Sequence, residues 1–425
     1  MDFIEELKWR NMLHDLTPGA AERLAEGKAR GYIGFDPTAP SMTIGNYVQI
    51  MLLRLFQLSG HQPIVLMGGA TGRVGDPSGK DKERELKSPE ELDRNLRFQK
   101  EQMKKFLDFE GENAAVIVNN LDFYKEMNVL DFLRNVGKTL TVNYMMSKDS
   151  VKNRLDTGLS FTEFSYQLLQ AYDFQVLYSD YNCEFQMGGS DQWGNITSGT
   201  EFIRRNAEGK AYAVTTPLLK KADGKKFGKS EDGNIWLDPK MTSPYKFYQF
   251  WINADDADIP TFMRYFTLKS KEEVLALEEQ YAEDPRALKA ILAEEITARV
   301  HSPEACESVK QVSKLLFDKK FNKADFEALN ADTFDLLSGE IPYNIVTTEQ
   351  FSSDTNIIDF LLLSGDFASK SEVRNLIKGK ALSLNFSKVE SMEQTVGDFE
   401  VLVDKYYYLQ KGKKNKRIMA ISNAH

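Results

Sequence analysis

The chain has 425 residues, of which 42% are hydrophobic and 28% are charged. That length is too great for one compact domain, so we expect two or three. No apolar run approaches the roughly 20 residues that a helix needs to span a bilayer, and the first residues, MDFIEE, lack the basic and apolar regions of a signal peptide. We therefore expect a cytoplasmic protein with no membrane partner.

The net charge of −9 argues against nonspecific binding of nucleic acid through the whole surface, because such binding needs many cations facing phosphates. The two cysteines, Cys183 and Cys306, lie far apart, and the four histidines have no metal-ligand spacing. We therefore expect no protein metal site. Any chemistry must use Lys, Arg, Asp, Gln, Tyr and Thr side chains together with backbone amides.

Residues 1–241 alternate short β-branched runs with amphipathic helical stretches, which predicts βαβ units, a parallel sheet and a Rossmann-like α/β catalytic domain. The predicted strands are 32–35, 63–67, 115–118, 184–187 and 211–214. We expect helices to start at Thr17-Pro18, at Ser88-Pro89 and at Ser160, where Glu163 completes a capping-box pattern.

Beyond residue 241, Leu, Ala, Glu and Lys recur at helical spacing, which predicts an all-helical domain over 242–335. Residues 336–352 lose this periodicity and are expected to form a connector. Residues 353–425 are expected to form a small α+β domain, with two helices followed by strands in ALSLNF and DKYYYLQKGKKNKRIM. The domain carries a basic cluster that is either a solvated tail or a phosphate-binding surface: Lys411, Lys413, Lys414, Lys416 and Arg417.

The stretch GYIGFDPTAPSMTIGN lies at the carboxyl end of the first predicted strand of the parallel sheet, where such sheets bind ligands. Gly34 to Thr38 would end the strand, and the helix from about Gly45 would present free amides and a positive dipole to an anion. An ordinary strand-to-helix turn is an equal alternative.

Two polar loops, GDPSGKD at 75–81 and GKKFGKS at 224–230, supply Gly and Lys but do not meet the requirements of a Walker loop. Each either covers a polyphosphate as a mobile loop or is a solvated turn.

The stretch SFTEFSYQLLQAYDF places Tyr166, Gln170 and Asp173 at i, i+4 and i+7, on one face of a largely apolar helix. Leaving such groups unpaired in a core costs on the order of 1–3 kcal/mol each. They therefore bind either a ligand with an ammonium or hydroxyl group, or one another. In QMGGSDQWGN, Asp191 either accepts from a ribose hydroxyl or caps the next helix.

Taken together, these segments resemble one family, the bacterial tyrosyl-tRNA synthetases, which are class I aminoacyl-tRNA synthetases. Six motifs carry the resemblance in order: YIGFDPTAPSMTIGN at the HIGH position, GGATGRVGDPSGK, VNYMM, FTEFSYQLLQAYDF, GGSDQWGNI, and KKFGKS at the KMSKS position. The resemblance covers nearly the whole chain. It implies that L-tyrosine and ATP form tyrosyl-adenylate and pyrophosphate, and that the tyrosyl group then passes to the 3′ end of tRNA(Tyr).

The resemblance also implies roles for single residues. Those implied to bind tyrosine are Tyr32, Asp76, Tyr166, Gln170, Asp173 and Gln192. Those implied to bind ATP are Asp36, Gly45, Gly189, Asp191 and Lys229. Those implied to act in catalysis, mostly on the polyphosphate, are Thr38, Thr43, Asn46, Lys80, Arg84, Lys226, Lys229 and Ser230. Catalysis would be positioning plus electrostatic stabilisation, with Mg²⁺ accompanying ATP and no dedicated protein metal site.

For the rest of the chain, the resemblance implies a helical domain that faces the tRNA anticodon arm. It implies a ribosomal-protein-like RNA-binding fold at the C-terminus, whose basic cluster contacts phosphates. It further implies a homodimer formed through the catalytic domain, in the region of VLDFLRNVGKTLTVNYMM.

The chain departs from the family pattern at the HIGH position, where Thr43 and Asn46 stand in place of histidines. A hydroxyl and an amide still donate hydrogen bonds, over a shorter reach. Ile33 likewise stands where some members place a polar ribose contact. Two alternatives remain open: a sister enzyme for another aromatic amino acid such as tryptophan, and a non-catalytic RNA-binding protein with the synthetase fold. Tyr32 with Asp173 favours a phenol, and the intact KFGKS loop favours an enzyme.

Overall fold

The computed structural model describes residues 1–78, 86–155, 158–230, 233–412 and 415–422. Contacts divide the chain into two compact units. Unit 1 comprises residues 1–242 and 249–300, and unit 2 comprises residues 243–248 and 301–425. No helix in the described ranges is long and apolar enough to cross a membrane.

Unit 1 is built on a six-stranded sheet in the order β1-β6-β5-β2-β3-β4. Its strands are β1 (Asp15–Leu16), β2 (Arg30–Phe35), β3 (Gln62–Met67), β4 (Val116–Asn119), β5 (Phe185–Gly189) and β6 (Tyr212–Thr216). Neighbours are parallel except for β1, which pairs antiparallel with β6. The five predicted strands and their parallel arrangement are confirmed. Strand β1 escaped prediction because two residues show no periodicity.

The strand order changes direction between β2 and β5. The chain runs outward from β2 through β3 to β4, returns to β5 beside β2, and runs outward again to β6. Strands β2 and β5 pair only at Gly31 with Phe185 and at Tyr32 with Gln186, although both strands continue for three more residues. Their carboxyl ends therefore separate, which opens a crevice at this edge of the sheet.

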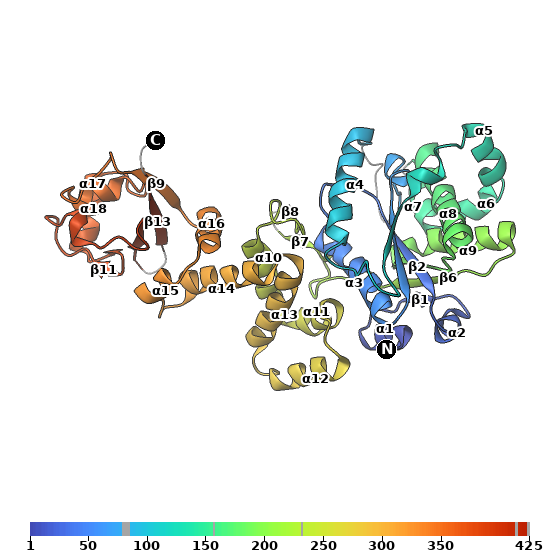
Figure 1. Ribbon diagram of the computed structural model, residues 1–425, viewed down its shortest axis with the longest axis horizontal. Helices are drawn as coiled ribbons and strands as arrows, with labels where there is room; N and C mark the ends of the chain where they lie inside the picture. Colours follow the sequence, from blue (N-terminus) through green and yellow to red (C-terminus); the bar gives the residue numbers. More distant parts are fainter. Residues whose placement is uncertain (79–85, 156–157, 231–232, 413–414, 423–425) are drawn as a thin grey trace. The chain divides into compact units, whose positions relative to one another are not determined.

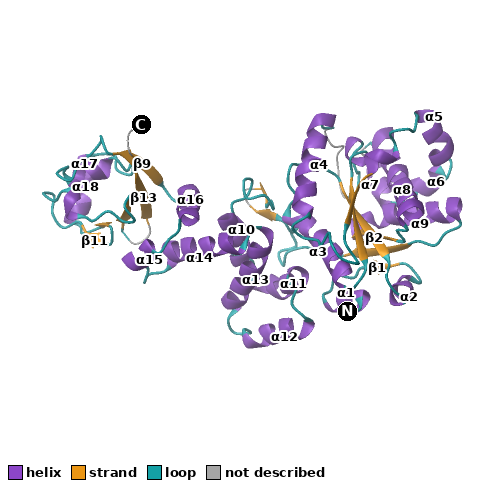
Figure 2. Cartoon of the chain, in the orientation of Figure 1, coloured by secondary structure: helices purple, strands orange, loops and turns teal. Residues whose placement is uncertain are grey.

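Helices cover both faces of the sheet: α3 and α4 lie on one side, and α8 and α9 lie on the other (Figures 1 and 2). Up to residue 207, the helices and helical turns of unit 1 are α1 (Phe3–Trp9), α2 (Ala20–Ala25), α3 (Ile44–Leu58), η1 (Thr71–Arg73), α4 (Pro89–Met103), η2 (Asn120–Phe123), α5 (Val129–Asp131), η3 (Phe132–Gly137), α6 (Val142–Met146), α7 (Asp149–Leu155), α8 (Phe161–Tyr181), η4 (Ser190–Gln192) and α9 (Trp193–Ala207).

Two of the predicted helix starts are confirmed in detail. The side chains of Ser88 and Ser160 accept the backbone N–H groups of Glu91 and Glu163. The carboxylate of Glu163 forms a buried ion pair with Arg154 at 2.8 Å. Helix α2 begins at Ala20, after Gly19 in the left-handed conformation, rather than at the predicted Thr17-Pro18.

The rest of unit 1 comprises the hairpin β7 (Lys229–Ser230) and β8 (Gly233–Asn234) and a set of helices. Those helices are α10 (Pro244–Ile252, shared with unit 2), η5 (Asp256–Asp258), α11 (Ile259–Phe266), α12 (Lys271–Gln280) and α13 (Pro285–Val300). Phe266 of α11 stacks on Tyr47 of α3, with the ring centroids 6.1 Å apart. This aromatic packing places the first part of the predicted helical domain in the same unit as the sheet.

Unit 2 contains a five-stranded sheet in the order β11-β10-β12-β13-β9. Its strands are β9 (Tyr343–Thr347), β10 (Leu382–Leu384), β11 (Ser387–Lys388), β12 (Tyr406–Lys411) and β13 (Asn415–Ser422). Its helices are α14 (Pro303–Phe317), α15 (Lys323–Glu327), α16 (Ala331–Glu340), α17 (Ile357–Leu362), α18 (Lys370–Lys378) and the turn η6 (Val396–Asp398). The two helices and the strands predicted after residue 353 are present.

Segment 336–352, which we expected to be an aperiodic connector, holds the end of α16 and strand β9. Strand β9 pairs in parallel with β13, whose residues lie about 75 positions later, as in Tyr343 with Ile418. A single edge strand with a distant partner shows no pattern in its own residues. The predicted helical domain 242–335 is likewise divided, because α14 to α16 belong to unit 2.

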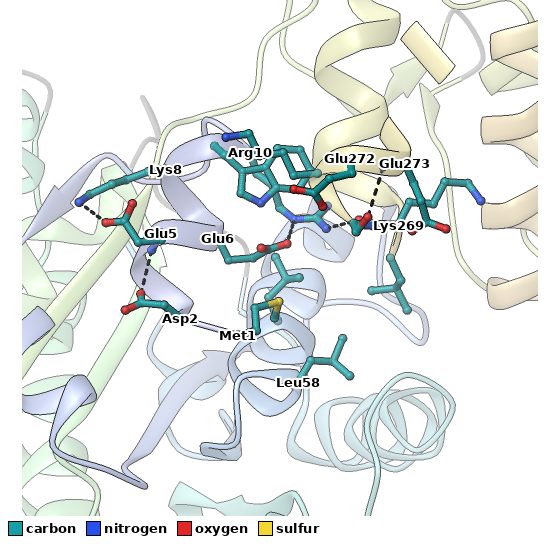
Figure 3. Close-up of a pocket in the computed structure, with 15 residues that line it drawn as sticks. Met1, Asp2, Glu5, Glu6, Lys8, Arg10, Leu58, Lys269, Glu272 and Glu273 are labelled. Carbon is teal, nitrogen blue, oxygen red and sulfur yellow. Dashed lines mark hydrogen bonds and ion pairs between the residues drawn. The ribbon is translucent and has the colours of Figure 1, made fainter. Parts of the chain in front are cut away.

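Arg10 ties the N-terminal helix of unit 1 to the end of α11. Figure 3 shows its bonds to Glu6 and Lys269 at the edge of an adjoining pocket. Its guanidinium donates to the carbonyl oxygens of Arg264, Thr267 and Lys269 at 2.5, 2.9 and 2.8 Å, and to the carboxylate of Glu6 at 2.8 Å. Arg10 is only 1% exposed. It therefore satisfies carbonyl groups at the end of α11 that the helix cannot pair internally.

We predict that Arg10→Met lowers the free energy of unfolding of unit 1 by about 3 kcal/mol, because it leaves buried carbonyls and the Glu6 carboxylate without their donor. Urea denaturation followed by tryptophan fluorescence measures this. Lys8→Met on the same helix is the matched control, because the Lys8 to Glu5 ion pair is exposed. Equal effects of the two substitutions would contradict the assigned role of Arg10.

Candidate functional site

A cavity of about 550 Å³ opens at the separated carboxyl ends of β2 and β5. It is lined by fifteen of the predicted site residues: Tyr32, Asp36, Thr38, Thr43, Gly45, Asn46, Asp76, Tyr166, Gln170, Asp173, Gly189, Asp191, Gln192, Lys226 and Lys229. Ser230 follows Lys229 in β7. The predicted residues Lys80 and Arg84 lie outside the described residues. The structure thus brings together predicted residues from positions 32 to 229.

One phenol, that of Tyr32, and one carboxylate, that of Asp173, lie in the buried part of the cavity. Tyr32 is 1% exposed, and its hydroxyl has no hydrogen-bond partner among the described residues. Asp173, also 1% exposed, accepts hydrogen bonds from Asn120 Nδ2 at 2.8 Å and from the Tyr124 hydroxyl at 2.7 Å. Burial raises the pKa of Asp173 to about 7, while those two hydrogen bonds oppose the increase. Burial and the nearby Asp173 raise the pKa of Tyr32 well above 10.

The carboxylate of Asp36 links strand β2 to helix α8. It accepts hydrogen bonds from the Tyr166 hydroxyl at 3.0 Å and from Thr71 Oγ1 at 2.7 Å. Gly68 at the end of β3 allows this arrangement, because a Cβ at that position would collide with the Asp36 carboxylate. The Tyr166 hydroxyl is therefore paired inside the protein. Internal pairing was one of the two alternatives for the polar face of this helix.

Asp76 has a network of neutral donors in the described part of the chain. Gln192 Nε2 donates at 2.7 Å, the backbone N–H of Ser78 at 2.9 Å, and Asn195 Nδ2 at 3.5 Å. Asp76 is 9% exposed. Nearby along the same cavity, Gln170 Oε1 is buried without a hydrogen-bond partner among the described residues. These groups leave acceptors available for a ligand that carries hydrogen-bond donors.

Thr43 and Asn46 are bound to each other at the start of α3. The Asn46 side-chain oxygen accepts from the Thr43 backbone N–H at 2.9 Å and from the Thr43 hydroxyl at 2.8 Å, which completes a reciprocal capping box. The Thr43 hydroxyl is thus used within the cap. The Asn46 amide group keeps its two N–H donors, and it is exposed at the cavity.

The KFGKS loop lies against the same helix start. Gly228 has φ +95°, and a Cβ there would lie 3.3 Å from the Gly45 backbone nitrogen, so a side chain would crowd both loops. Phe227 is buried and packs its ring against Phe262 and Phe266, with centroids 5.1 and 5.2 Å apart. Lys226 and Lys229 remain exposed at the cavity edge. The loop therefore holds its two lysines beside the α3 N-terminus.

Asp191 does not cap the helix that follows it. The residues at the N-cap positions of η4 and α9 are Gly189 and Gln192, and neither makes a side-chain cap bond. Asp191 is exposed at the cavity. The capping alternative for Asp191 is therefore removed.

The structure corrects the interpretation of the basic cluster in unit 2. Arg417 is buried, with hydrogen bonds to Asp366 at 2.6 Å and to the Asn344 side chain and the Ser364 carbonyl. Lys411 pairs with Glu372 at 2.7 Å. Lys416 donates to the carbonyl oxygens of Leu315 and Leu316 in α14.

Three of the five cations in this cluster therefore have structural partners within unit 2, and Arg417 is too buried to contact phosphate. Lys413 and Lys414 lie outside the described residues.

Among the described residues, four polar residues that support the predicted carboxylates escaped prediction from the sequence: Asn120, Tyr124, Thr71 and Asn195. Each contacts a predicted carboxylate through its side chain. The Asn119-Asn120 pair at the carboxyl end of a predicted strand is the one signal that could have identified Asn120.

A second cavity of about 780 Å³, drawn in Figure 3, is lined by α1, the end of α3 and the start of α12. It contains none of the predicted site residues and lies away from the carboxyl ends of the strands, so we assign function to the smaller cavity. Among the described residues, no group of three or more His, Cys, Asp or Glu side chains is arranged to hold a metal ion.

Comparisons with known proteins bear on both units. A family model described as "tRNA synthetases class I (W and Y)" matches residues 24–318, and one described as "Tyrosine--tRNA ligase SYY-like C-terminal domain" matches residues 339–419. The chain is 53% identical over 420 residues to a tyrosine–tRNA ligase of Cytophaga hutchinsonii, which covers 97% of this chain and 98% of the relative. It is 49% identical over 430 residues to that of Porphyromonas gingivalis, with coverage of 99% and 100%.

Solved structures share the fold. A C-terminally truncated mitochondrial tyrosyl-tRNA synthetase of Aspergillus nidulans is 30% identical with a TM-score of 0.67, over 74% of this chain and 94% of that chain. A tryptophanyl-tRNA synthetase of Encephalitozoon cuniculi is 13% identical with a TM-score of 0.52, over 72% of this chain and 87% of that chain. At this identity the likeness shows the fold alone. The resemblance inferred from the motifs is confirmed: the chain belongs to the class I tRNA synthetases for tryptophan and tyrosine, and within them to the bacterial tyrosyl-tRNA synthetases.

Proposed function

We propose that the cavity binds L-tyrosine and ATP, joins them to tyrosyl-adenylate with release of pyrophosphate, and transfers the tyrosyl group to the 3′ end of tRNA(Tyr). The observation that carries this proposal is the buried, unpaired hydroxyl of Tyr32 in the cavity that also contains the Asp173 carboxylate. A phenol hydroxyl both accepts and donates, so it pairs with Tyr32 and with Asp173 at once. This makes the enzyme a tyrosine–tRNA ligase.

The same pair of groups explains the choice among aromatic amino acids. Phenylalanine brings no hydroxyl, so it would leave the buried Tyr32 hydroxyl unpaired and would give no donor to the Asp173 lone pairs that face the cavity. Tryptophan brings a single N–H donor and no acceptor at its ring. We therefore favour tyrosine over the tryptophan-using alternative.

The amino group of the substrate is assigned to Asp76, Tyr166 and Gln170. The donors to Asp76 in the described part of the chain are uncharged, so a substrate ammonium would supply the counter-charge that this nearly buried carboxylate lacks. Gln192, which already contacts Asp76, is assigned to the substrate carboxylate.

ATP is assigned to the outer part of the cavity, where the described cations stand. Asp36, Gly45, Gly189 and Asp191 would contact the nucleoside. The Asn46 amide, Thr38 and Thr43, together with Lys226, Lys229 and Ser230 and with Lys80 and Arg84 outside the described ranges, would contact the polyphosphate. Because Thr43 already bonds Asn46, we expect Asn46 to contribute more than Thr43.

In this arrangement a tyrosine carboxylate oxygen attacks the α-phosphorus of ATP, and the bond to the β-phosphate bridging oxygen breaks. The lysines and the Gly45 N–H at the start of α3 stabilise the negative charge that moves onto the leaving pyrophosphate. The neighbouring N–H groups of Ile44 and Asn46 already donate to the Ile235 carbonyl and to the Thr43 hydroxyl. A hydroxyl of the terminal tRNA ribose then attacks the tyrosyl carbonyl, and AMP leaves. No protein nucleophile is needed, and we propose that Mg²⁺ arrives with the ATP phosphates.

The direct test is amino-acid-dependent ATP–pyrophosphate exchange with tyrosine, phenylalanine and tryptophan. We expect exchange with tyrosine and little with the other two. Absence of exchange with every amino acid would instead favour the non-catalytic RNA-binding alternative.

In the same assay, Asp173→Ala should raise the KM for tyrosine by about tenfold or more, because a hydrogen bond to a charged group is lost. The preference for tyrosine over phenylalanine should fall by a similar factor. Asp180→Ala, at an exposed aspartate on the same helix, is the matched control. Unchanged discrimination in Asp173→Ala would remove Asp173 from the proposed site.

We assign tRNA binding outside the cavity to the helical segment 242–335, as the domain facing the anticodon arm, and to the C-terminal segment 353–425. Within the latter, we restrict the proposed phosphate contacts to Lys413 and Lys414, because Arg417 is buried and because Lys411 and Lys416 already have partners in unit 2. A lysine that faces phosphate releases counterions when RNA binds, so its contribution depends on salt.

Replacing both Lys413 and Lys414 by Gln should weaken tRNA binding and charging without changing ATP–pyrophosphate exchange. The slope of log affinity against log salt should become shallower by about 1 to 2. Replacing the exposed pair Lys319 and Lys320 by Gln is the control for loss of positive charge in the same unit. The assignment fails if the two double variants bind tRNA with the same affinity and salt slope.

We also propose a homodimer through the catalytic unit. Large apolar side chains are exposed around α5, α6 and the start of α8: Val129 (69%), Leu130 (73%), Leu133 (50%), Val142 (59%), Met146 (38%) and Phe161 (74%). Such a cluster on one unit is typical of a protein interface. A second copy of the same chain is the proposed occupant of this surface. Separately, we propose that the protein is located in the cytoplasm, where tRNA and ATP meet.

Leu130→Glu should convert the protein from a dimer to a monomer in sedimentation experiments, because it places a charge where apolar surface would be buried. Leu275→Glu, at an exposed leucine of α12, controls for the charge itself. A wild-type protein that sediments as a monomer at micromolar concentration would rule the dimer out.

A further inference from the structure

Tyr124 contacts the substrate-recognising carboxylate from outside the cavity. Its hydroxyl donates to Asp173 Oδ1 at 2.7 Å. The carbonyl oxygen of Leu169 lies 3.0 Å away, but a hydroxyl has one hydrogen and the carboxylate is the stronger acceptor. Tyr124 is not among the residues that line the cavity. It therefore acts on Asp173 and not on a ligand.

The orientation of Tyr124 is set by packing. Its ring contacts the rings of Phe132 and Tyr172, with centroids 6.4 and 5.7 Å away. Asn120 donates to the other carboxylate oxygen, Oδ2, at 2.8 Å. With one donor on each oxygen, the plane of the Asp173 carboxylate is fixed, and the remaining lone pairs are available to the cavity.

The two donors also meet a physical need. Asp173 is 1% exposed, and its hydrogen-bond donors among the described residues are neutral. A buried carboxylate without a cation stays ionised only when hydrogen bonds replace its lost hydration. Tyr124 supplies one of the two.

We propose that Tyr124 is a positioning residue for amino-acid selection: its hydroxyl keeps Asp173 ionised and oriented to accept a hydrogen bond from the phenol of tyrosine. The inference rests on the proposed role of Asp173 as the acceptor for that phenol. Nothing in the sequence pattern singled out Tyr124, because it lies in a short turn almost 50 residues before Asp173.

The electrostatics predict how the effect depends on pH. The pKa of Asp173 is raised to about 7, mainly by burial and to a smaller degree by Asp36, while the bonds from Asn120 and Tyr124 oppose the rise. The phenols that face Asp173 all have a raised pKa, mainly through burial, and stay neutral near pH 7: Tyr32, Tyr124, Tyr166 and Tyr172. Loss of the Tyr124 hydroxyl therefore raises the pKa of Asp173, and the carboxylate is lost at a higher pH.

The test is Tyr124→Phe in the full-length protein, assayed by ATP–pyrophosphate exchange with tyrosine and with phenylalanine from about pH 6 to about pH 9. At pH 7 we expect kcat/KM for tyrosine to fall about tenfold, with little change for phenylalanine. The pH dependence of kcat/KM reports the pKa values of the free enzyme. The acid limb of the kcat/KM profile for tyrosine should therefore move about one pH unit higher. Discrimination should recover at high pH.

Two variants make each outcome decisive. Tyr172→Phe removes a hydroxyl from the ring that packs on Tyr124 and should leave the tyrosine profile in place. Asp173→Ala reports separately on the proposed acceptor. One outcome is that Asp173→Ala loses the preference for tyrosine over phenylalanine, while Tyr124→Phe keeps both this preference and the wild-type acid limb. In that case the role of Tyr124 is overturned and the role of Asp173 stands.

If Asp173→Ala itself keeps discrimination, the proposed phenol site fails first. An equal loss for both amino acids in Tyr124→Phe, with no movement of the acid limb, would show a merely structural role and also overturn the inference. Equilibrium binding of tyrosine and phenylalanine without ATP provides a second readout that does not depend on turnover.

Discussion

The short parallel pairing between β2 and β5 shapes the rest of the site. Only two residue pairs join these strands, and both strands then continue past the last pair. The gap this leaves is bounded on one side by Tyr32 to Asp36 and on the other by Gln186 to Gln192. Helix α8 lies beside the gap and contributes Tyr166, Gln170 and Asp173. The cavity therefore follows from the change in strand order, and its polar lining follows from which residues end each strand.

Charge is divided within this cavity. Asp36, Asp76 and Asp173 are set among neutral donors that include Tyr166, Gln192 and Tyr124. The lysines of the KFGKS loop stand at the exposed edge, beside the start of α3. A molecule with an ammonium and a phenol suits the acidic interior, and a polyphosphate suits the edge. This division suits the proposed alignment of a substrate carboxylate with the α-phosphate of ATP.

The start of α3 shows how this chain uses the residues at the HIGH position. Thr43 and Asn46 close a capping box on each other, so the helix start is held by its own side chains. Gly45 and Gly228 still allow the two loops to approach each other closely. Phe227, buried among Phe262 and Phe266, attaches the lysine loop to helix α11. The position of the loop thus depends on aromatic packing outside the motif itself.

The sequence by itself determined five of the six strands in the first 216 residues, two of the helix starts, the family, and most of the residue types at the site. It could do so because periodicity, helix caps and motifs are local patterns. The tertiary structure alone decided which distant groups meet: Tyr166 with Asp36, Gln192 with Asp76, and Tyr124 with Asp173. It also decided that Arg417 is buried against Asp366 and that β9 pairs with β13. Such contacts depend on chain folding over tens to more than a hundred residues, and no local pattern records them.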